Sequence, residues 1–283
     1  MKNIGIICKT GDPGPAEILK KLLPWLKQKG FETIVDSGIA SFLNIEGCPR
    51  LQIPTLSDMI IVLGGDGTML SVCRLVGERE TPILGVNIGG LGFLTEVQRE
   101  EIYDVLEEVL KGKCPVEERI MLEAHVYRKD ESIAEYAVMN DVVVNKGALA
   151  RIIDLETYID RDYVTTFRAD GLIVATPTGS TAYALSAGGP ILYPTLKSIV
   201  LAPICPHMLT NRPIVLPDNV LIEMILRSPA EDVFLTVDGQ VGFSLNLDDI
   251  IEVKKSQFKT KLLTPSGKKY FQILRTKLKW GER

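Results

Sequence analysis

One stretch of sequence, Met59-Ile60-Ile61-Val62-Leu63-Gly64-Gly65-Asp66-Gly67-Thr68, indicates the fold more directly than any other. Its first five residues form an unbroken apolar run, which is typical of a strand buried on both faces of a sheet. Residues 69–76 are expected to form a helix. Gly64, Gly65, Gly67 and Thr68 therefore belong to a loop between a buried strand and a helix, where backbone N–H groups form a cradle for phosphate.

Asp66 is the unexpected member of this loop, because a carboxylate repels phosphate unless it has a task of its own. Besides simple turn formation, that task is either to bind Mg²⁺ or to accept the proton of an attacking hydroxyl. The chain has no Walker A pattern, and Leu70 stands where a dinucleotide-binding fingerprint needs its third glycine. The loop therefore indicates a kinase, of the 6-phosphofructokinase, lipid kinase or NAD kinase type.

The flanking sequence alternates between short apolar runs and amphipathic stretches. Strands are expected at residues 4–8, 33–35 and 83–86, and helices at residues 16–29 and 101–111. Such alternation predicts a parallel sheet with helices on both sides. We therefore expect a Rossmann-like α/β domain over residues 1–115.

After Pro115 the sequence is rich in β-branched residues between turns, which predicts a β-sandwich-like domain over residues 116–283. Its expected strands are residues 121–127, 134–144, 152–159, 163–168, 172–175, 199–202, 220–225, 233–237, 250–255 and 258–263. A glycine-rich block at residues 176–190 interrupts them. The sequence does not indicate where the tail, residues 265–283, packs, and a return to the first domain stays open.

Composition excludes several classes of function. The net charge is -4 and no run of Lys or Arg stands out, which argues against a nucleic-acid partner. The five cysteines contain no Cys-x-x-Cys pair, and two histidines are too few for a convincing zinc site. No stretch has the roughly 18 apolar residues of a membrane span, and the first residues do not resemble a signal peptide. A cytoplasmic location without membrane association is expected.

Two polar motifs are expected close to the carboxyl ends of the buried strands. Asn87-Ile88-Gly89-Gly90-Leu91-Gly92-Phe93-Leu94 follows the strand next to the glycine loop, and parallel strands end on the same side of a sheet. Phe93 would offer a face for a base, or would plug a hydrophobic gap. Asn140 and Asp141 lie within a Val-rich segment, where they would read ribose hydroxyls or ring atoms unless they form a simple turn.

The block from Thr176 to Pro190 completes a recognisable set. The chain carries GGDGT, NIGxLGFL, ND, FRxDG at 167–171, TPTGSTAYxLSAGGP at 176–190 and TVDGQ at 236–240. In this order these motifs resemble those of bacterial NAD kinases, over residues 4 to about 245. The resemblance implies transfer of the γ-phosphate of ATP to the 2′-hydroxyl of the adenosine ribose of NAD. It also implies an α/β domain followed by a β domain, a divalent metal such as Mg²⁺, and a homodimer or homotetramer.

By the same resemblance, Asp66 is the catalytic residue, which accepts the proton of the 2′-hydroxyl, with metal ligands left undetermined. The NAD-binding residues implied are Asp66, Gly67, Phe93, Asn140, Asp141, Arg168, Asp170, Thr181, Ala182, Tyr183, Ala184, Leu185, Ser186 and Gln240, with Arg151 matched more loosely. Two alternatives stay open at this point. A lipid kinase of the diacylglycerol or sphingosine type would share the glycine loop, and a non-catalytic NADP(H)-binding sensor would share the fold.

Overall fold

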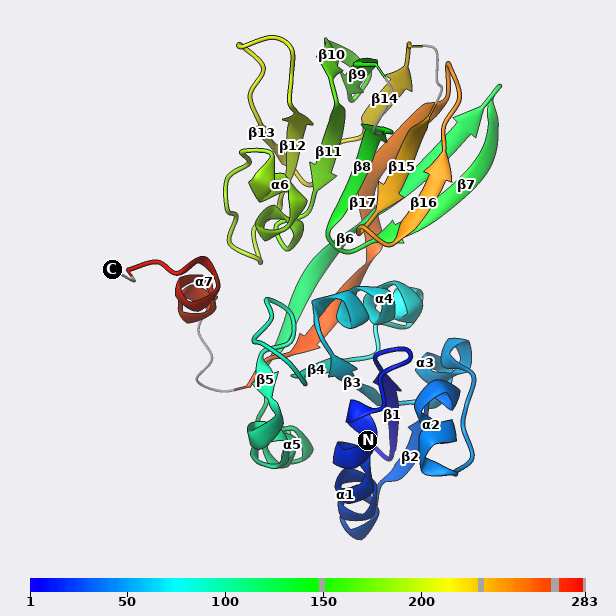
Figure 1. Cartoon of the computed structure of the whole chain (residues 1–283), viewed down its shortest axis with the longest axis vertical. Coiled ribbons are helices and arrows are strands. Elements are labelled where there is room, and N and C mark those ends of the chain that lie inside the picture. The colour runs from blue at the N-terminus through cyan, green and yellow to red at the C-terminus, as the bar shows by residue number, and fades with distance from the viewer. Residues whose placement is uncertain (148–150, 229–231, 266–269, 282–283) are drawn as a thin grey trace. The chain divides into compact units, whose positions relative to one another are not determined.

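The computed structural model describes residues 1–147, 151–228, 232–265 and 270–281 (Figure 1). The chain forms two compact units. The first contains Met1–Glu118 together with Thr260–Arg283, and the second contains Arg119–Lys259. The end of the chain therefore belongs to the first unit, and the change of unit falls at residue 118, where the sequence suggests 115.

The first unit is built on a parallel sheet in the order β4-β3-β1-β2. Its strands are β1 (Asn3–Cys8), β2 (Glu32–Val35), β3 (Met59–Gly64) and β4 (Ile83–Asn87), with the short β5 (Val97–Gln98) beside β4. All six residues of β3 are buried, as its apolar run predicts. The carboxyl ends of β1, β3 and β4 lie at one edge of the sheet, which positions the loops that follow them.

Helices cover both faces of this sheet. α1 (Gly14–Gln28) and α5 (Ile102–Leu110) share one apolar cluster with it, and α1 contributes Leu19, Leu22 and Leu26 from one side. α3 (Ile53–Leu56) and α4 (Asp66–Val76) pack on the opposite face, where Ile53 contacts the backbone at Gly5 and Met69 the backbone at Gly85. The predicted α/β fold of this unit is confirmed.

The remaining short elements of the first unit lie outside the sequence prediction. They are α2 (Ser37–Leu43), α7 (Tyr270–Leu278) and the 3₁₀ turns η1 (Arg50–Gln52), η2 (Gly77–Arg79) and η3 (Arg99–Glu101). The predicted helix at 69–76 begins three residues earlier, so Asp66 stands in its first turn. Among the described residues, no helix is both long enough and apolar enough to span a bilayer.

The second unit consists of two antiparallel layers. One has the strand order β10-β9-β14-β17, with β6 beside β17 and β7 beside β6; the other has the order β13-β12-β11-β8-β15-β16. The first layer contains β6 (Val116–Arg128), β7 (Glu131–Val138), β9 (Ile153–Ile159), β10 (Asp162–Ala169), β14 (Ile222–Leu226) and β17 (Ile250–Leu263). The second contains β8 (Asp141–Lys146), β11 (Gly171–Ala175), β12 (Ser198–Ile204), β13 (Ile214–Pro217), β15 (Val233–Val237) and β16 (Val241–Ser244). The first three residues of β6 and the last four of β17 belong to the first unit.

The core of this unit lies between the two layers, as in a sandwich. Val142 and Val144 of β8 share a buried cluster with residues of the other layer, such as Leu155 and Ile251. The alternate residue Val143 points to the outer face, where it packs with Ala184 and Leu192. The turn η4 (Gly179–Thr181) and the short helix α6 (Tyr183–Ser186) thereby cover that outer face (Figure 1).

Three expected strands are divided or joined in the structure, and others differ in their bounds, as β6 does, which covers Val116–Arg128 where 121–127 was expected. The strand predicted at 134–144 is two strands, because the chain bends at Met139 and Asn140 between β7 and β8. The strands predicted at 250–255 and 258–263 are one continuous strand, β17. The polar run around Ser256 suggests a turn, but its hydroxyl donates a 2.7 Å hydrogen bond to Glu123 and the strand continues.

Candidate functional site

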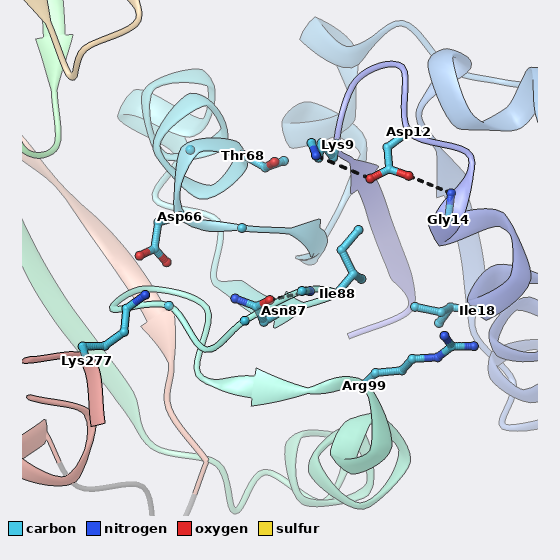
Figure 2. A pocket seen from close by; sticks show the side chains of 15 residues that line it. Lys9, Asp12, Gly14, Ile18, Asp66, Thr68, Asn87, Ile88, Arg99 and Lys277 are labelled. Atoms are coloured by element: carbon cyan, nitrogen blue, oxygen red, sulfur yellow. Dashed lines mark hydrogen bonds and ion pairs between the residues drawn. The ribbon is translucent and has the colours of Figure 1, made fainter. Parts of the chain in front are cut away.

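The first unit has a cavity of about 600 Å³ at the carboxyl ends of its parallel strands. Side chains from the β1–α1 loop, the glycine loop, the segment after β4 and α7 converge on it (Figure 2). It is lined by Lys9, Asp12, Gly14, Ile18, Gly65, Asp66, Gly67, Thr68, Asn87, Ile88, Gly89, Gly90, Gly92, Arg99 and Lys277. The glycine loop and the glycine-rich motif after β4 therefore meet, as parallel strand order predicts.

The Asp66 carboxylate is held by the loop that contains Phe93. It accepts hydrogen bonds from the backbone N–H groups of Phe93 at 2.8 Å, Leu94 at 3.0 Å and Thr95 at 3.1 Å. The Thr95 hydroxyl donates a fourth, at 3.1 Å. The Asp66 side chain is thus held in a defined orientation at the lining of this cavity.

Gly92 and Asn87 make this arrangement of Asp66 possible. A Cβ atom on Gly92 would lie 2.1 Å from Asp66 Oδ1, so any larger residue would displace the carboxylate. Asn87, at the end of β4, accepts a hydrogen bond from the Gly89 N–H at 2.7 Å and donates one to the Thr95 hydroxyl at 2.7 Å. Asn87 and Thr95 are both buried.

Three cations face the cavity that contains Asp66. Lys9 follows β1 and lies 3.6 Å from Asp12, and Arg99 lies on η3. Lys277 comes from α7 and its ammonium lies 5.8 Å from the centre of the Phe93 ring. Cations and glycine-rich backbone around one cavity suit a polyanionic ligand. The face that Phe93 was expected to offer to a base is here beside a lysine.

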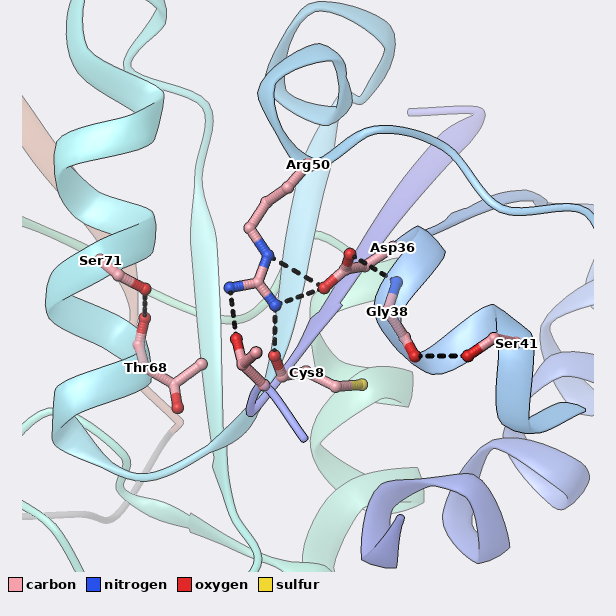
Figure 3. Close-up of polar contacts among 8 residues, drawn as sticks. Cys8, Asp36, Gly38, Ser41, Arg50, Thr68 and Ser71 are labelled. Atoms are coloured by element: carbon pink, nitrogen blue, oxygen red, sulfur yellow. Dashed lines mark hydrogen bonds and ion pairs between the residues drawn. The ribbon is translucent and has the colours of Figure 1, made fainter. Parts of the chain in front are cut away.

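A second polar cluster lies next to this cavity (Figure 3). Arg50 donates to Asp36, to the Cys8 carbonyl and, at 3.2 Å, to the Thr10 hydroxyl. It thereby joins the carboxyl ends of β1 and β2. Burial is the main cause that raises the pKa of the Cys8 thiol to about 12, so this cysteine is a packed apolar side chain and not a nucleophile.

The second unit has a cavity of about 310 Å³ on the outer face of its second layer. It is lined by Asn140, Asp141, Val143, Asn145, Ala182, Tyr183, Thr236, Asp238 and Gly239. Asp141, Val143 and Asn145 alternate along β8, so they point to the same face. Among the described residues, the side-chain oxygens of Asn140 and Asn145 are buried without a hydrogen-bond partner, which suits polar groups that await a ligand.

The bend at Asn140 is fixed from two sides. The buried carboxylate of Asp238 accepts the backbone N–H groups of Met139 at 3.2 Å, Asn140 at 2.7 Å and Asp141 at 3.2 Å. On the other side, Thr176 donates its N–H to the Asn140 carbonyl at 2.8 Å and its hydroxyl to the Met139 carbonyl at 2.7 Å. The hydroxyl-rich block therefore builds the cavity as well as lining it.

Asp141 is a buried carboxyl whose pKa rises from 3.8 to about 7. Burial is the main cause, and the charge of Asp238 adds to it, whereas a hydrogen bond from the Tyr183 N–H opposes it. Between pH 3.8 and about pH 7, the folded protein therefore keeps a proton on Asp141 that the unfolded chain has released. The contribution of Asp141 to the free energy of unfolding is fully present below the pKa of the unfolded chain, and it is lost as pH rises through the folded pKa of about 7.

The Asp141→Asn variant tests this linkage. We expect wild-type unfolding free energy to fall between about pH 5 and about pH 8 by roughly 2–4 kcal/mol more than that of Asp141→Asn. Urea unfolding at both pH values measures the difference, and Asp130→Asn, at an exposed turn, is the control. Equal pH dependence of wild type and Asp141→Asn would show that Asp141 is ionised throughout this range.

The other predicted NAD-binding residues do not line the second cavity. Arg168 is exposed and lies 3.9 Å from Asp154, and Asp170 lies 3.6 Å from the Lys146 ammonium. Thr181 donates its hydroxyl to the Thr178 carbonyl at 3.2 Å. The second cavity is also not lined by Arg151, Ala184, Leu185, Ser186 or Gln240. Gly64 does not line the first cavity. Their role in binding stays a prediction.

Sequence reasoning missed several residues of both cavities. In the second unit, Thr236, Asp238 and Gly239 belong to the TVDGQ motif, which was a usable signal. The signal for Asn145 was weaker: it lies four residues after Asp141 in the same strand and therefore on the same face. In the first unit, Lys9, Arg99 and Lys277 carry no pattern that distinguishes them from other surface cations.

Comparison with known proteins identifies two family domains in the chain. The ATP-NAD kinase N-terminal domain matches residues 4–114, and the ATP-NAD kinase C-terminal domain matches residues 139–265. Among curated relatives, the NAD kinases of Geotalea daltonii and Geobacter sulfurreducens are 52% and 51% identical to this chain, each over 100% of both sequences.

Two solved structures are similar over nearly the whole chain. The yeast NADH kinase complexed with NADH has a TM-score of 0.93 and 29% identity, and the match covers 100% of this chain and 89% of the other. An NAD kinase from Archaeoglobus fulgidus in complex with ATP has a TM-score of 0.79 and 27% identity, with 98% of each chain covered.

Proposed function

This chain belongs to the ATP-NAD kinase family, and from that membership we propose that it transfers the γ-phosphate of ATP to the 2′-hydroxyl of the adenosine ribose of NAD. The single observation that carries this proposal is the family match over the full length of the chain, with Asp66 intact in its glycine loop. The product is NADP. The lipid kinase and the non-catalytic sensor lose their support, because the full-length relatives are NAD kinases.

We propose that ATP binds in the cavity of the first unit. Gly65, Gly67 and Thr68 would contact its phosphates from the start of α4, and Lys9, Arg99 and Lys277 would balance their charge. A loose phosphoryl-transfer transition state spreads negative charge over the transferring group, so this environment would stabilise it. The ATP complex of the Archaeoglobus fulgidus relative is consistent with such a donor.

We propose that Asp66 accepts the proton of the 2′-hydroxyl. As the ribose oxygen bonds to the γ-phosphorus, the bond from that phosphorus to the bridging oxygen of ADP breaks, and the proton moves to the carboxylate. Four hydrogen bonds hold Asp66 in its orientation, which reduces the entropy lost on reaching the transition state.

We propose that NAD is recognised chiefly by the cavity of the second unit. Asn140 and Asn145 offer unpaired carboxamide oxygens, and Asp141, whose pKa rises to about 7, offers a hydrogen-bond donor in its protonated form. Tyr183 presents an exposed ring at the same cavity, against which a base would stack. Arg151, Arg168, Asp170, Thr181, Ala184, Leu185, Ser186 and Gln240 remain proposed contacts by family resemblance.

A divalent metal, Mg²⁺ in the first instance, would enter with the ATP phosphates. Among the described residues no cluster of three or more His, Cys, Asp or Glu side chains forms a metal cage. In the first cavity the carboxylates are those of Asp12 and Asp66, and Asp66 already accepts four hydrogen bonds. Such a sparse donor set fits Mg²⁺, which kinases hold largely through substrate phosphates. When bound, the ion would neutralise phosphate charge. A cytoplasmic homodimer or homotetramer remains our proposal for the assembly.

Incubation of the purified protein with ATP, Mg²⁺ and NAD is expected to produce NADP. NADP is measured by an NADP-specific dehydrogenase assay. Parallel reactions contain diacylglycerol or sphingosine in place of NAD. Phosphorylation of either lipid without NADP would favour the lipid kinase. Binding of NADP(H) without turnover, across several metals and phosphate donors, would favour the sensor.

A further inference from the structure

The two carboxylate oxygens of Asp66 have different surroundings. Oδ1 accepts three hydrogen bonds, from the Leu94 N–H, the Thr95 N–H and the Thr95 hydroxyl. Oδ2 accepts one, from the Phe93 N–H. A carboxylate offers about four lone-pair positions in all, or two for each oxygen. Oδ1 is therefore fully occupied, and Oδ2 keeps a position for a further partner.

The direction of the Thr95 hydroxyl follows from its neighbours. The Gly89 N–H donates to Asn87 Oδ1 at 2.7 Å, which fixes the orientation of the Asn87 carboxamide. Its Nδ2 must then face Thr95 Oγ1, to which it donates at 2.7 Å. Since the hydroxyl receives this hydrogen bond, its single proton is available to Asp66 Oδ1 at 3.1 Å. The chain of donors runs from Gly89 to Asn87 to Thr95 to Asp66.

Packing leaves this chain of hydrogen bonds little freedom. Thr95 is completely buried and Asn87 is 5% exposed. At Gly92, a Cβ atom would lie 2.1 Å from Asp66 Oδ1 and 2.3 Å from the Thr95 hydroxyl oxygen. The backbone at Gly92 thus lies so close to Asp66 and Thr95 that only a glycine fits at this position. Because Asn87 and Thr95 are buried and hydrogen-bonded to each other, they hold Oδ1 of Asp66 in one geometry.

We propose that Thr95 is a positioning residue for phosphoryl transfer: its hydroxyl, oriented by Asn87, anchors Oδ1 of Asp66 so that Oδ2 faces the substrate hydroxyl. The inference rests on the proposed function, in which Asp66 receives the proton of that hydroxyl. Thr95 does not line the cavity, so it acts through Asp66. Its effect is on the orientation of Asp66 and on how tightly Asp66 holds a proton.

Thr95→Val removes the hydroxyl and keeps the shape of the side chain. We expect kcat to fall about 10- to 100-fold, the loss typical of one hydrogen bond to a charged group, while KM for ATP and NAD stays within about threefold. The acidic limb of the kcat/KM profile should move to higher pH, because the ionised carboxylate loses a donor. Thr95→Ser, which restores the hydroxyl, should recover most of kcat and the wild-type pH profile.

The control is Thr81→Val, in the same unit. Thr81 is also buried, and its hydroxyl donates to the Pro54 carbonyl at 3.4 Å, away from the cavity lining. It should retain wild-type kcat and pH dependence. Thr95→Val with wild-type kcat and an unmoved acidic limb would overturn the proposal, as would a Thr95→Ser variant as impaired as Thr95→Val. Thr95→Ala takes the place of valine if that variant does not fold.

Carboxyl-carbon NMR separates this inference from the proposed function. The Asp66 resonance is identified as the one missing in Asp66→Asn, and its titration is followed without turnover. Thr95→Val should raise the titration midpoint and Thr95→Ser should restore it. If wild type makes no NADP, the proposed function fails, yet the anchoring of Asp66 is still tested by this midpoint. An unmoved midpoint in an active enzyme would refute the anchoring alone.

Discussion

Asp66→Asn is expected to lower kcat for NADP formation by about 10²- to 10⁴-fold, the usual contribution of a positioned general base. An asparagine cannot take the proton of the ribose hydroxyl. In the wild type both carboxylate oxygens accept backbone N–H groups, Oδ2 from Phe93 and Oδ1 from Leu94 and Thr95. In the variant, the NH₂ group of asparagine would therefore face one of these N–H donors. Both effects act on the transition state more than on substrate binding.

Initial rates at saturating ATP and NAD measure the Asp66→Asn effect, and KM for both substrates shows whether binding survives. Asp104→Asn, an exposed carboxylate in the first turn of α5, serves as the matched control and should behave as wild type. Turnover within a few-fold of wild type in Asp66→Asn would mean that the hydroxyl loses its proton elsewhere. Asp66 would then act only as an electrostatic element of the donor cavity.

Gly179→Ala is expected to damage the second unit through its backbone. The added Cβ would lie 2.2 Å from the carbonyl oxygen of Asn140 and 2.5 Å from its carbonyl carbon, and neither atom can rotate away. The bend is also held by the Asp238 carboxylate, which accepts the Asn140 N–H at 2.7 Å. We expect a loss of about 1–3 kcal/mol in unfolding free energy and at least about tenfold weaker NAD binding, because Asn140 and Asp141 shift together.

Urea unfolding and KM for NAD measure the two effects of Gly179→Ala. Gly242→Ala in β16 is the control, since a Cβ there meets no atom within 4 Å and its φ angle is not positive. KM for ATP should change little, because the glycine loop belongs to the other unit. Unchanged KM for NAD in a Gly179→Ala protein of reduced stability would separate this bend from NAD recognition.

Local patterns in the sequence determined much of the fold and of the candidate site. The apolar run at 59–63 is a buried strand, and the helices at 16–29 and 101–111 lie within two residues of their expected bounds. These features depend on neighbours a few positions away, which periodicity and capping report directly. The bend at Asn140 was not predicted: the sequence singled out Asn140 and Asp141, but a continuous strand was expected through them.

The sequence by itself determined the family and the parallel sheet beneath the glycine loop, because contiguous motifs encode both, and it singled out Asp66, whose catalytic role is our proposal. The tertiary structure alone decided what surrounds that carboxylate. Thr95 lies 29 positions from Asp66, Asp238 lies 98 positions from Asn140, and Lys277 reaches the first cavity from the last helix. Such partners are brought together by strand order and chain return, and a hydrogen bond across that separation leaves no periodic trace in the sequence.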